Sequence, residues 1–532
     1  MSLIDGTSHS ATQVQARGVA GHEQRCRLQA ASQSTFAHFE KDAFMPEKPR
    51  LDKAADWTGH WWLPEDPDNT VAGVLRYDPA DGLRLDLIGG FEDRILRPIE
   101  HGVAVMQGSR TWPVIVGLAD NKEITLIDCW PSHSNTYGMG FDGPHKQTVR
   151  AMTALVGAHL NDIEQAAFTE LRVSVENLGH WSDSSVFDGV IGIKDDKIDG
   201  TGSLSVKSVE EPSVTVDGTT ITLAHEHTLP HFDRRRGETV GRMRDTVFVR
   251  LKPESPYTLA SARDHAQAIQ DLLSLATNRA SGLLWMQLRF PREEDKTPNA
   301  PPQLPRDVAV HTDSIVQGDA DAQAVDHHNV LFTCEHISFA DVILRWWQTR
   351  RTLHAASNMV LGLRYAPARY LEGNLLTAVG AAEVMHRALG INKERIPHEE
   401  FDALREALLV CAPDEHKSWI KGSIRNDVTL RERLRDLAGR PGSQAMARLV
   451  PDVEEWARVA TQARNDLAHT GLTSRHSIDE LVAAVRVTTA VVIMNLLQEL
   501  GIPEGRQREV VGDNSELRHT AELAAEHLTK KS

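Results

Sequence analysis

Residues 454–471 read EEWARVATQARNDLAHTG, and this stretch decides how the C-terminal third of the chain folds. Val459, Ala463 and Leu467 recur at intervals of four residues, which places them on one apolar face of a helix. Gly471 follows the last periodic residue and suits the left-handed position that commonly ends a helix. The stretch therefore predicts an amphipathic helix over residues 451–469.

The polar residues of this predicted helix suit chemistry on RNA. Asn465 and His469 share a second face, whereas Arg464 lies about 140° from His469 around an ideal helix. The guanidinium fork of arginine matches phosphate oxygens, and histidine can serve as base or acid near neutral pH. Either the long Arg464 side chain curls toward His469, or a second chain completes the site. Asn465 could orient the imidazole across one turn.

Further helical segments surround this stretch and predict an all-α bundle over residues 336–505. Pro and Gly breaks separate them, as at Ala412-Pro413. The other expected helices cover residues 338–361, 369–389, 398–411, 414–424, 428–438 and 476–500. We expect residues 506–532 to form a polar tail or a frayed helix.

The chain before the bundle has a different pattern. From Trp57 to about residue 250, short alternating runs are separated by turn residues, which predicts a β-rich, sandwich-like or barrel-like domain over residues 46–285. The clearest hairpin is VTVDGTTITL, with Asp217-Gly218 between two β-branched runs. Residues 148–160 fit a helix or a strand equally well.

Three other segments complete the expected organisation. Residues 257–280 have helical spacing and predict a helix near the end of the β-rich domain. Residues 286–335 contain a run of prolines and predict a linker or exposed loop. Residues 1–45 lack periodicity and predict a disordered arm. The fold class is therefore α+β and multidomain.

Composition excludes several classes of protein. The formal net charge of -16 disfavours a chain coated in nucleic acid, although a small basic cleft remains compatible with it. The four cysteines lack the C-x-x-C spacing of a zinc ribbon, and their wide separation disfavours a disulfide scaffold. The N-terminus lacks the apolar core of a signal peptide, and no long apolar run occurs. We expect a cytoplasmic protein that does not bind membranes and uses no metal or cofactor.

The Arg464-x4-His469 pattern, in a late helix of a bundle, resembles the HEPN superfamily. The opening WTGHWWLP at residues 57–64 and the following VAGVL resemble ApeA-like abortive-infection proteins, which join a β-rich N-terminal domain to a C-terminal HEPN domain. The helix RYLEGNLLTAVGAAEVMHRAL resembles the early helix of such a domain, with Glu383 as its buried polar residue. The resemblance covers roughly residues 50–505.

This resemblance implies a function and a set of site residues. Arg464 and His469 correspond to the catalytic pair, and Asn465 to a frequent polar position, with Asp466 and Glu383 as supporting residues. The implied activity is a metal-independent endoribonuclease that cleaves RNA as a homodimer formed through the HEPN domain. The implied role is an antiphage abortive-infection effector, whose N-terminal domain senses a phage-derived trigger or restrains the nuclease.

Three arginines on the first bundle helix, Arg345, Arg350 and Arg351, are further candidates for RNA contact. Their neighbours Trp346 and Trp347 are expected in the core or in a dimer interface. The alternative function is a non-catalytic HEPN-like module that binds RNA or dimerises, attached to a ligand-sensing β domain.

Two histidine-rich stretches are candidate metal sites. His225 and His227 lie on the same side of a strand, and residues 326–336 contain three histidines and a cysteine. We favour ordinary polar histidines in the first stretch, and the spacing in the second matches no known zinc finger.

Overall fold

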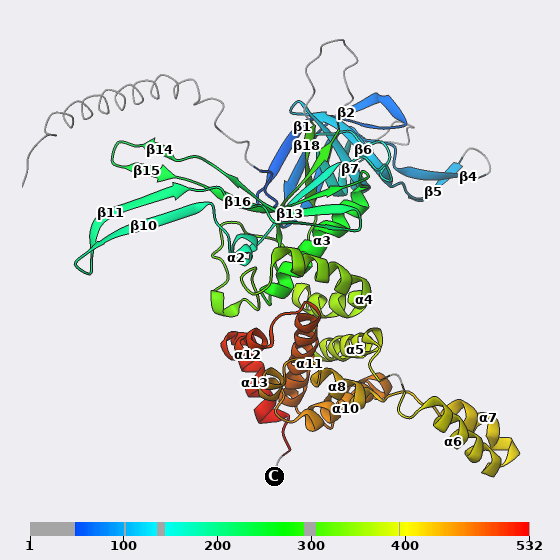
Figure 1. Cartoon of the computed structure of the whole chain (residues 1–532). Coiled ribbons are helices and arrows are strands. Elements are labelled where there is room, and N and C mark those ends of the chain that lie inside the picture. Colours follow the sequence, from blue (N-terminus) through cyan, green and yellow to red (C-terminus); the bar gives the residue numbers. More distant parts are fainter. Residues whose placement is uncertain (1–47, 100–102, 136–143, 292–304, 393, 531–532) are drawn as a thin grey trace, which may run out of the picture. The chain divides into compact units, whose positions relative to one another are not determined.

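A computed structural model describes residues 48–99, 103–135, 144–291, 305–392 and 394–530. Pro49–Ser532 forms one compact unit, in which a β-barrel-rich region over residues 55–312 precedes an all-helical region over residues 339–527 (Figure 1). The fold class predicted from the sequence is therefore confirmed. The predicted arm over residues 1–45 lies outside the described residues.

Within the described residues, six antiparallel strands close into a barrel. Around the ring, neighbouring strands follow in the order β8, β3, β2, β1, β6 and β7, and pairing of β7 with β8 closes it. The barrel strands are β1 (Ala55–Leu63), β2 (Asp66–Asp78), β3 (Gly82–Ile88), β6 (Trp112–Ala119), β7 (Lys122–Asn135) and β8 (Lys146–Val156). The undecided residues 148–160 thus form mainly strand β8.

The tryptophan-rich opening builds the barrel interior. Trp57 and Trp61 lie four apart on β1, so both point to the same side of the strand, and both are buried. Gly59 lies between them, where a Cβ atom would collide with the backbone of β6. The motif therefore combines two large core side chains with the one residue that permits close packing of β1 on β6.

A second set of strands extends the sheet from β8 in the order β18, β17, β9, β16, β13 and β12. Their bounds are β9 (Glu170–Val175), β12 (Ser213–Val216), β13 (Thr219–His227), β16 (Asp245–Pro253), β17 (Leu283–Phe290) and β18 (Arg306–Thr312). Asp217 and Gly218 have φ values of 50° and 70°, which confirms the predicted hairpin between β12 and β13.

Among the described residues before the helical region, three two-stranded hairpins lie outside the large sheet, and two helices accompany the strands. The hairpins are β4 (Arg94–Ile99) with β5 (Val103–Ser109), β10 (Phe187–Lys194) with β11 (Lys197–Val206), and β14 (His231–Arg234) with β15 (Thr239–Arg242). The helices are α2 (Leu178–Ser182) and α3 (Leu259–Ala276), and α3 confirms the helix predicted near residues 257–280.

The predicted linker over residues 286–335 is wrong where the structure describes it. Strand β17 continues to Phe290, and β18 pairs with both β17 and β8. Val330, Leu331 and Phe332 are fully buried. The prolines that suggested a linker fall largely in the undescribed residues 292–304, between two strands of the sheet.

The helical region contains each of the predicted helices, with small differences at the ends. Its elements are η2 (His327–Asn329), α4 (Phe339–Tyr365), α5 (Leu371–Leu389), α6 (His398–Cys411), α7 (Asp414–Ser423), α8 (Leu430–Ala438), α9 (Ser443–Leu449), α10 (Val453–Thr470), α11 (Ile478–Glu499), α12 (Glu504–Asp513) and α13 (Ser515–His527). Among the described residues, α11 alone is long and apolar enough to cross a membrane, but 72% of that stretch is buried inside the structure.

For residues 506–532, the structure contradicts the predicted tail and shows ordered helices rather than a frayed one. Helices α12 and α13 occupy most of it, and Val510, Leu517 and Ala524 are buried against the rest of the bundle. Asn514 lies between the two helices and caps α13 by accepting hydrogen bonds from the N–H groups of Glu516 and Leu517. Short helices with few apolar residues thus close the end of the core.

Candidate active site

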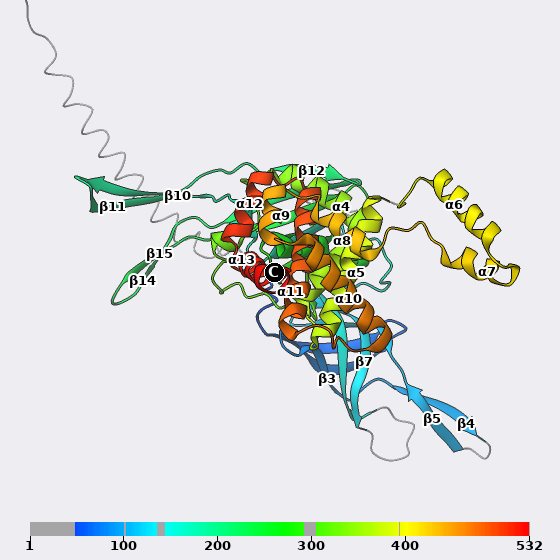
Figure 2. The same ribbon diagram turned by 90° about the horizontal axis from the view of Figure 1, so that it is seen from below.

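Helix α10 carries the predicted catalytic residues and packs against α5, α8 and α11 (Figure 2). Val459, Ala463 and Leu467 are buried, as their spacing predicted. Asp452 caps the first turn by accepting a hydrogen bond from the N–H of Glu455 at 2.9 Å. Gly471 ends the helix with φ 71°, so the glycine occupies the left-handed position expected from the sequence.

Arg464 lies on the partly exposed side of α10 and is held loosely. Its Nη1 donates a 3.2 Å hydrogen bond to Oδ1 of the neighbouring Asn465. Its Nη2 lies 3.5 Å from Oε2 of Glu383 on α5, which is too long for a strong hydrogen bond. The side chain is 37% exposed, so its guanidinium can move toward a ligand in solvent.

Glu383 gathers two further arginines beside Arg464. Its Oε1 accepts hydrogen bonds from Arg387 at 2.7 Å and from Arg433 on α8 at 3.1 Å. Arg433 is only 12% exposed, and its Nε is buried without a hydrogen-bond partner. Three guanidinium groups therefore face one carboxylate, which leaves a local excess of positive charge suited to a phosphate group.

The sequence prediction identified Arg464 and Glu383 in this cluster but missed Arg387 and Arg433. Arg387 follows Glu383 by four residues on α5, a spacing that brings side chains together on a helix and could have been noticed. Arg433 lies 50 residues from Glu383, so no local pattern connects the two.

His469 is exposed in the last turn of α10. Across the described part of the chain, no hydrogen bond or ion pair joins its imidazole to Arg464 or to Asn465. Asn465 is instead bonded to Arg464, so the suggested orientation of the imidazole by Asn465 is not formed in the single chain. The structure thus brings Arg464, Asn465 and Glu383 together and leaves His469 open to solvent at the helix end.

Asp466, the other candidate supporting residue, lies 3.6 Å from Arg475 in the loop that follows α10. This ion pair places a counter-charge near the Asp466 carboxylate. The carboxylate would otherwise repel a phosphate approaching the same end of the helix.

The three arginines of α4 have partners away from this cluster. Arg345 donates to the carbonyl of Leu500 at the end of α11, and Arg350 pairs with Asp264 at 3.1 Å. Arg351 pairs with Asp217 at 2.9 Å. Arg350 and Arg351 line a cavity of about 770 Å³ between α4, α3 and the β12–β13 turn. Their contact with RNA stays a prediction.

The tryptophans beside these arginines are core residues. Trp346 is completely buried, and its indole N–H donates to the carbonyl of Ala268 on α3 at 2.7 Å. Trp347 is nearly as buried. This contact joins α4 to the helix that precedes the last strands of the sheet.

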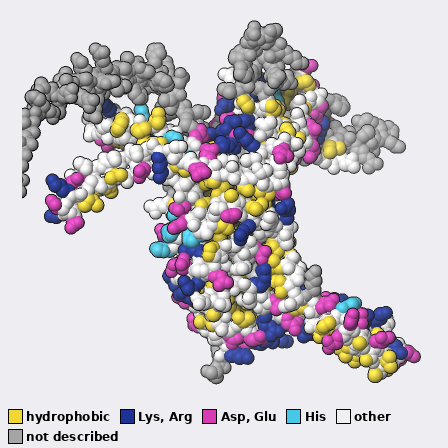
Figure 3. Space-filling view, viewed as in Figure 1, with side chains coloured by type: hydrophobic (Ala, Val, Ile, Leu, Met, Phe, Trp, Pro, Cys, Tyr) yellow, Lys and Arg dark blue, Asp and Glu magenta, His cyan; other side chains and the backbone are white. Residues whose placement is uncertain are grey.

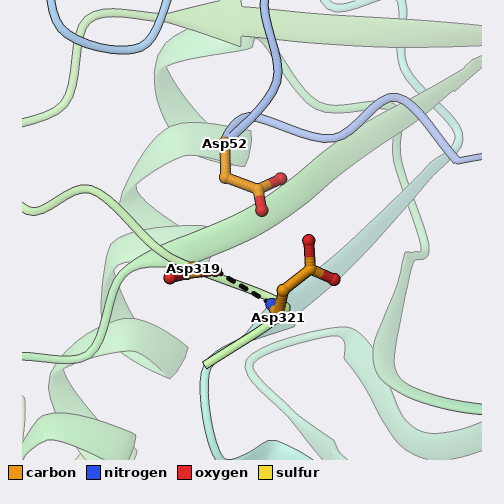
Figure 4. Close-up of side chains that lie close together, drawn as sticks. All are labelled: Asp52, Asp319 and Asp321. Carbon is orange, nitrogen blue, oxygen red and sulfur yellow. Dashed lines mark hydrogen bonds between the residues drawn. The ribbon is translucent and has the colours of Figure 1, made fainter. Parts of the chain in front are cut away.

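One acidic group among the described residues has the spacing of metal ligands. Carboxylate oxygens of Asp52, Asp319 and Asp321 lie within 4.8 Å of one another (Figure 4). Arg50 contacts both Asp52 and Asp321, and Lys53 contacts Asp321 at 2.9 Å. Hydrogen bonds from Arg50 and Lys53 lower the pKa of Asp321 to about 2. We assign no metal to this group, because Arg50 and Lys53 already pair with two of its three carboxylates.

The histidine-rich stretches do not bring together a metal-ligand set within the described residues. His225 is held on both sides by hydrogen bonds to Ser184 and Asp245. Nδ1 of His336 forms a 3.0 Å hydrogen bond with the hydroxyl of Thr333, three residues earlier.

The last turns of α10 thus carry an exposed histidine and a partly exposed arginine beside an arginine cluster. Residues 56–346 match the family model of ApeA N-terminal domain 1, and residues 376–506 match the model of the Apea-like HEPN domain. The chain therefore belongs to the ApeA family and has a C-terminal HEPN domain. No curated protein and no solved structure matches the chain.

Proposed function

We propose that the helical region is a metal-independent endoribonuclease and that the chain is a cytoplasmic antiphage effector acting by abortive infection. HEPN domains often carry ribonuclease activity. The observation that supports the proposal most is the end of α10, which presents Arg464 among clustered arginines and His469 to solvent. A polymer can reach this end, because the helix stops at Gly471 on the surface.

The proposed reaction needs proton transfer and charge stabilisation only. The 2′-hydroxyl of one nucleotide attacks the adjacent phosphorus, and the bond to the 5′-oxygen of the next nucleotide breaks. His469 accepts the hydroxyl proton or protonates the leaving oxygen. Arg464 moves from Glu383 to the phosphate, where its planar fork stabilises the extra negative charge. Arg433 and Arg387 add positive charge behind it.

A homodimer through the HEPN domain would complete this site. Arg464 and His469 point in different directions from one helix, so the second catalytic group is expected from another copy. Apolar side chains are exposed on either side of the site: Leu376, two helical turns before Glu383 on the same face of α5, and Leu472, directly after α10. Such exposed side chains next to a polar site favour a protein interface.

The N-terminal region is proposed to control the nuclease by recognising a phage-derived trigger. The β10–β11 hairpin exposes Val190, Ile191, Ile193 and Ile198, each by more than half of its surface, and hydrophobic side chains are visible along it (Figure 3). A two-stranded hairpin with such residues on its surface gains stability from a partner that covers them.

The proposal is tested with purified Arg464→Ala and His469→Ala proteins and an RNA substrate in EDTA. Each change is expected to slow cleavage by at least about a hundredfold, as loss of a general acid–base group or of a phosphate-stabilising charge does. Arg458→Ala is the matched control, because Arg458 lies on the same helix with the same 37% exposure. Undiminished cleavage by both variants would exclude these residues from catalysis.

A mixture of the two inactive variants tests the dimer. A heterodimer of an Arg464→Ala chain and a His469→Ala chain contains one site with both groups, if each site uses one residue from each chain. Cleavage that reappears on mixing supports the composite site. Cleavage that stays absent while the wild type is active places both groups in one chain. Inactive wild type that still binds RNA would favour the non-catalytic alternative.

A further inference from the structure

Ser184, His225 and Asp245 form a continuous hydrogen-bonded chain in the β-rich region. Oγ of Ser184 lies 2.8 Å from Nε2 of His225, and Nδ1 of the same ring lies 3.1 Å from Oδ1 of Asp245. The residues are 41 and 20 positions apart in sequence, so the fold alone brings them together. This is the order of contacts in a Ser-His-Asp catalytic triad.

The directions of these hydrogen bonds follow from the acids and bases involved. An ionised carboxylate can only accept, so Nδ1 of His225 carries a proton and donates it to Asp245. Nε2 of the neutral ring is then an acceptor, and the Ser184 hydroxyl donates to it. The imidazole is therefore placed to take the proton of the Ser184 hydroxyl, as a general base does.

The sheet fixes the base and its orienting acid. His225 on β13 pairs with Val247 on β16, and Asp245 lies two residues before Val247. His225 and Asp245 are consequently diagonal neighbours on one face of two paired strands. Their side chains are only 5% and 10% exposed, and Asp245 also accepts the N–H of Val186 at 3.2 Å. Little freedom remains for the imidazole ring.

The candidate nucleophile lies on a sharp turn at the surface. Ser184 follows α2 and precedes β10, and it is half-buried. The preceding residue, Asp183, has φ 50° and ψ 32°, a left-handed conformation that is uncommon outside glycine. This turn brings Ser184 to His225, and Ser184 stays partly exposed.

Backbone donors for an oxyanion are available next to the hydroxyl. The N–H of Ser184 has only a long 3.4 Å contact to Oγ of Ser182. The N–H of Ser185 has no hydrogen-bond acceptor among the described residues. One class of serine hydrolases uses the amide of the nucleophilic serine for this purpose, and another class uses the amide of the following residue, each together with a second amide.

We propose that Ser184, His225 and Asp245 are the catalytic triad of a second activity, the hydrolysis of uncharged carboxylic esters. Ser184 Oγ bonds to the carbonyl carbon while its proton passes to Nε2 of His225. The bond to the alcohol breaks, and the alcohol leaves with that proton. Water then attacks the acyl-serine, gives its proton to His225, and releases the acid and the serine hydroxyl. The exposed Asp183 carboxylate disfavours anionic esters.

The test uses the full chain with Arg464→Ala in the background, so that its outcome is independent of the proposed nuclease. The protein is treated with a fluorophosphonate probe, and the modified peptide is identified by mass spectrometry. Hydrolysis of p-nitrophenyl acetate is measured in parallel. Labelling is expected at Ser184, and Ser184→Ala is expected to abolish it. Thermal unfolding of each variant verifies that it is folded.

Two further variants separate a triad from an ordinary reactive serine. Asp245→Asn preserves shape but removes the charge that orients His225, and it is expected to slow both reactions by about a hundredfold or more. Ser205→Ala removes an exposed serine on β11 and is expected to change nothing. The proposal is overturned if the folded Arg464→Ala parent is not labelled, if labelling persists after Ser184→Ala, or if Asp245→Asn leaves the rate of the parent unchanged.

Discussion

Replacing His311 by glutamine is expected to reduce the loss of folding stability that acid causes in the β-rich region. His311 lies on β18, where it is 3% exposed and its ring packs at 5.0 Å from that of Trp57 and 4.9 Å from that of Tyr77. Its Nδ1 is buried without a hydrogen-bond partner. Burial in this apolar setting, with a smaller effect from Lys122, lowers the pKa of His311 to about 4.

The direction of the pH effect follows from the two states of the chain. The ordinary histidine pKa of 6.5 applies to the unfolded chain, which therefore binds a proton more readily than the folded chain does. The contribution of neutral His311 to stability is complete above pH 6.5 and is lost as the pH falls toward 4. At pH 5 the loss is about 2 kcal/mol, at about 1.4 kcal/mol per pH unit.

Urea unfolding of wild type and His311→Gln at pH 7.5 and pH 5, followed by tryptophan fluorescence, measures this contribution. The constant cost of the substitution cancels when the two pH values are compared. The difference in free energy of unfolding is expected to shift in favour of the variant by about 2 kcal/mol at pH 5. The exposed His60→Gln serves as the control for loss of an imidazole. A difference that is the same at both pH values would refute the reasoning.

The remaining predictions concern the helical region. Arg433→Ala is expected to lower kcat/KM for RNA cleavage at least about tenfold, because it removes a nearly buried charge behind Arg464, whereas the exposed Arg387→Ala should change it less. Gly471→Ala is expected to destabilise the region by about 1 kcal/mol in thermal unfolding, because its φ of 71° disfavours a side chain even though no atom obstructs a Cβ. The control Gly422→Ala lies in the ordinary helical backbone of α7 and should not destabilise the region. Added EDTA is expected to leave RNA cleavage unchanged, and a loss that Mg²⁺ restores would point to a metal mechanism.

Elements with strong local patterns could be predicted from the sequence. Helix α10 and its end at Gly471 followed from a regular apolar stripe and a terminal glycine. The β12–β13 hairpin followed from Asp217-Gly218, because two adjacent positive φ values suit few other pairs of residues. Closure of the barrel did not follow, since it depends on pairing of β3 with β8 and of β1 with β6, in which partner residues lie about 55 to 70 positions apart.

The errors in the prediction have physical causes. The prolines before Pro305 suggested a linker, but strand β18 beyond them is buried by contacts with β8, which lies about 150 residues earlier. Helices α12 and α13 were predicted as a tail or a frayed helix because their few apolar residues are buried by neighbours that are distant in sequence. For the same reason Arg433 near Glu383, and the contacts of Ser184 with His225, could not be recognised in advance.

The chemical ends of the RNA fragments test the nuclease account most directly. Purified wild type is incubated in EDTA with an RNA and with the DNA of the same sequence, and the products are analysed by mass spectrometry. Attack by a 2′-hydroxyl, assisted by His469 and Arg464, predicts fragments that end in 2′,3′-cyclic phosphate and begin with a 5′-hydroxyl. The DNA is expected to stay intact, because it lacks the 2′-hydroxyl. Fragments with 3′-hydroxyl and 5′-phosphate ends, or cleavage of the DNA, would contradict it.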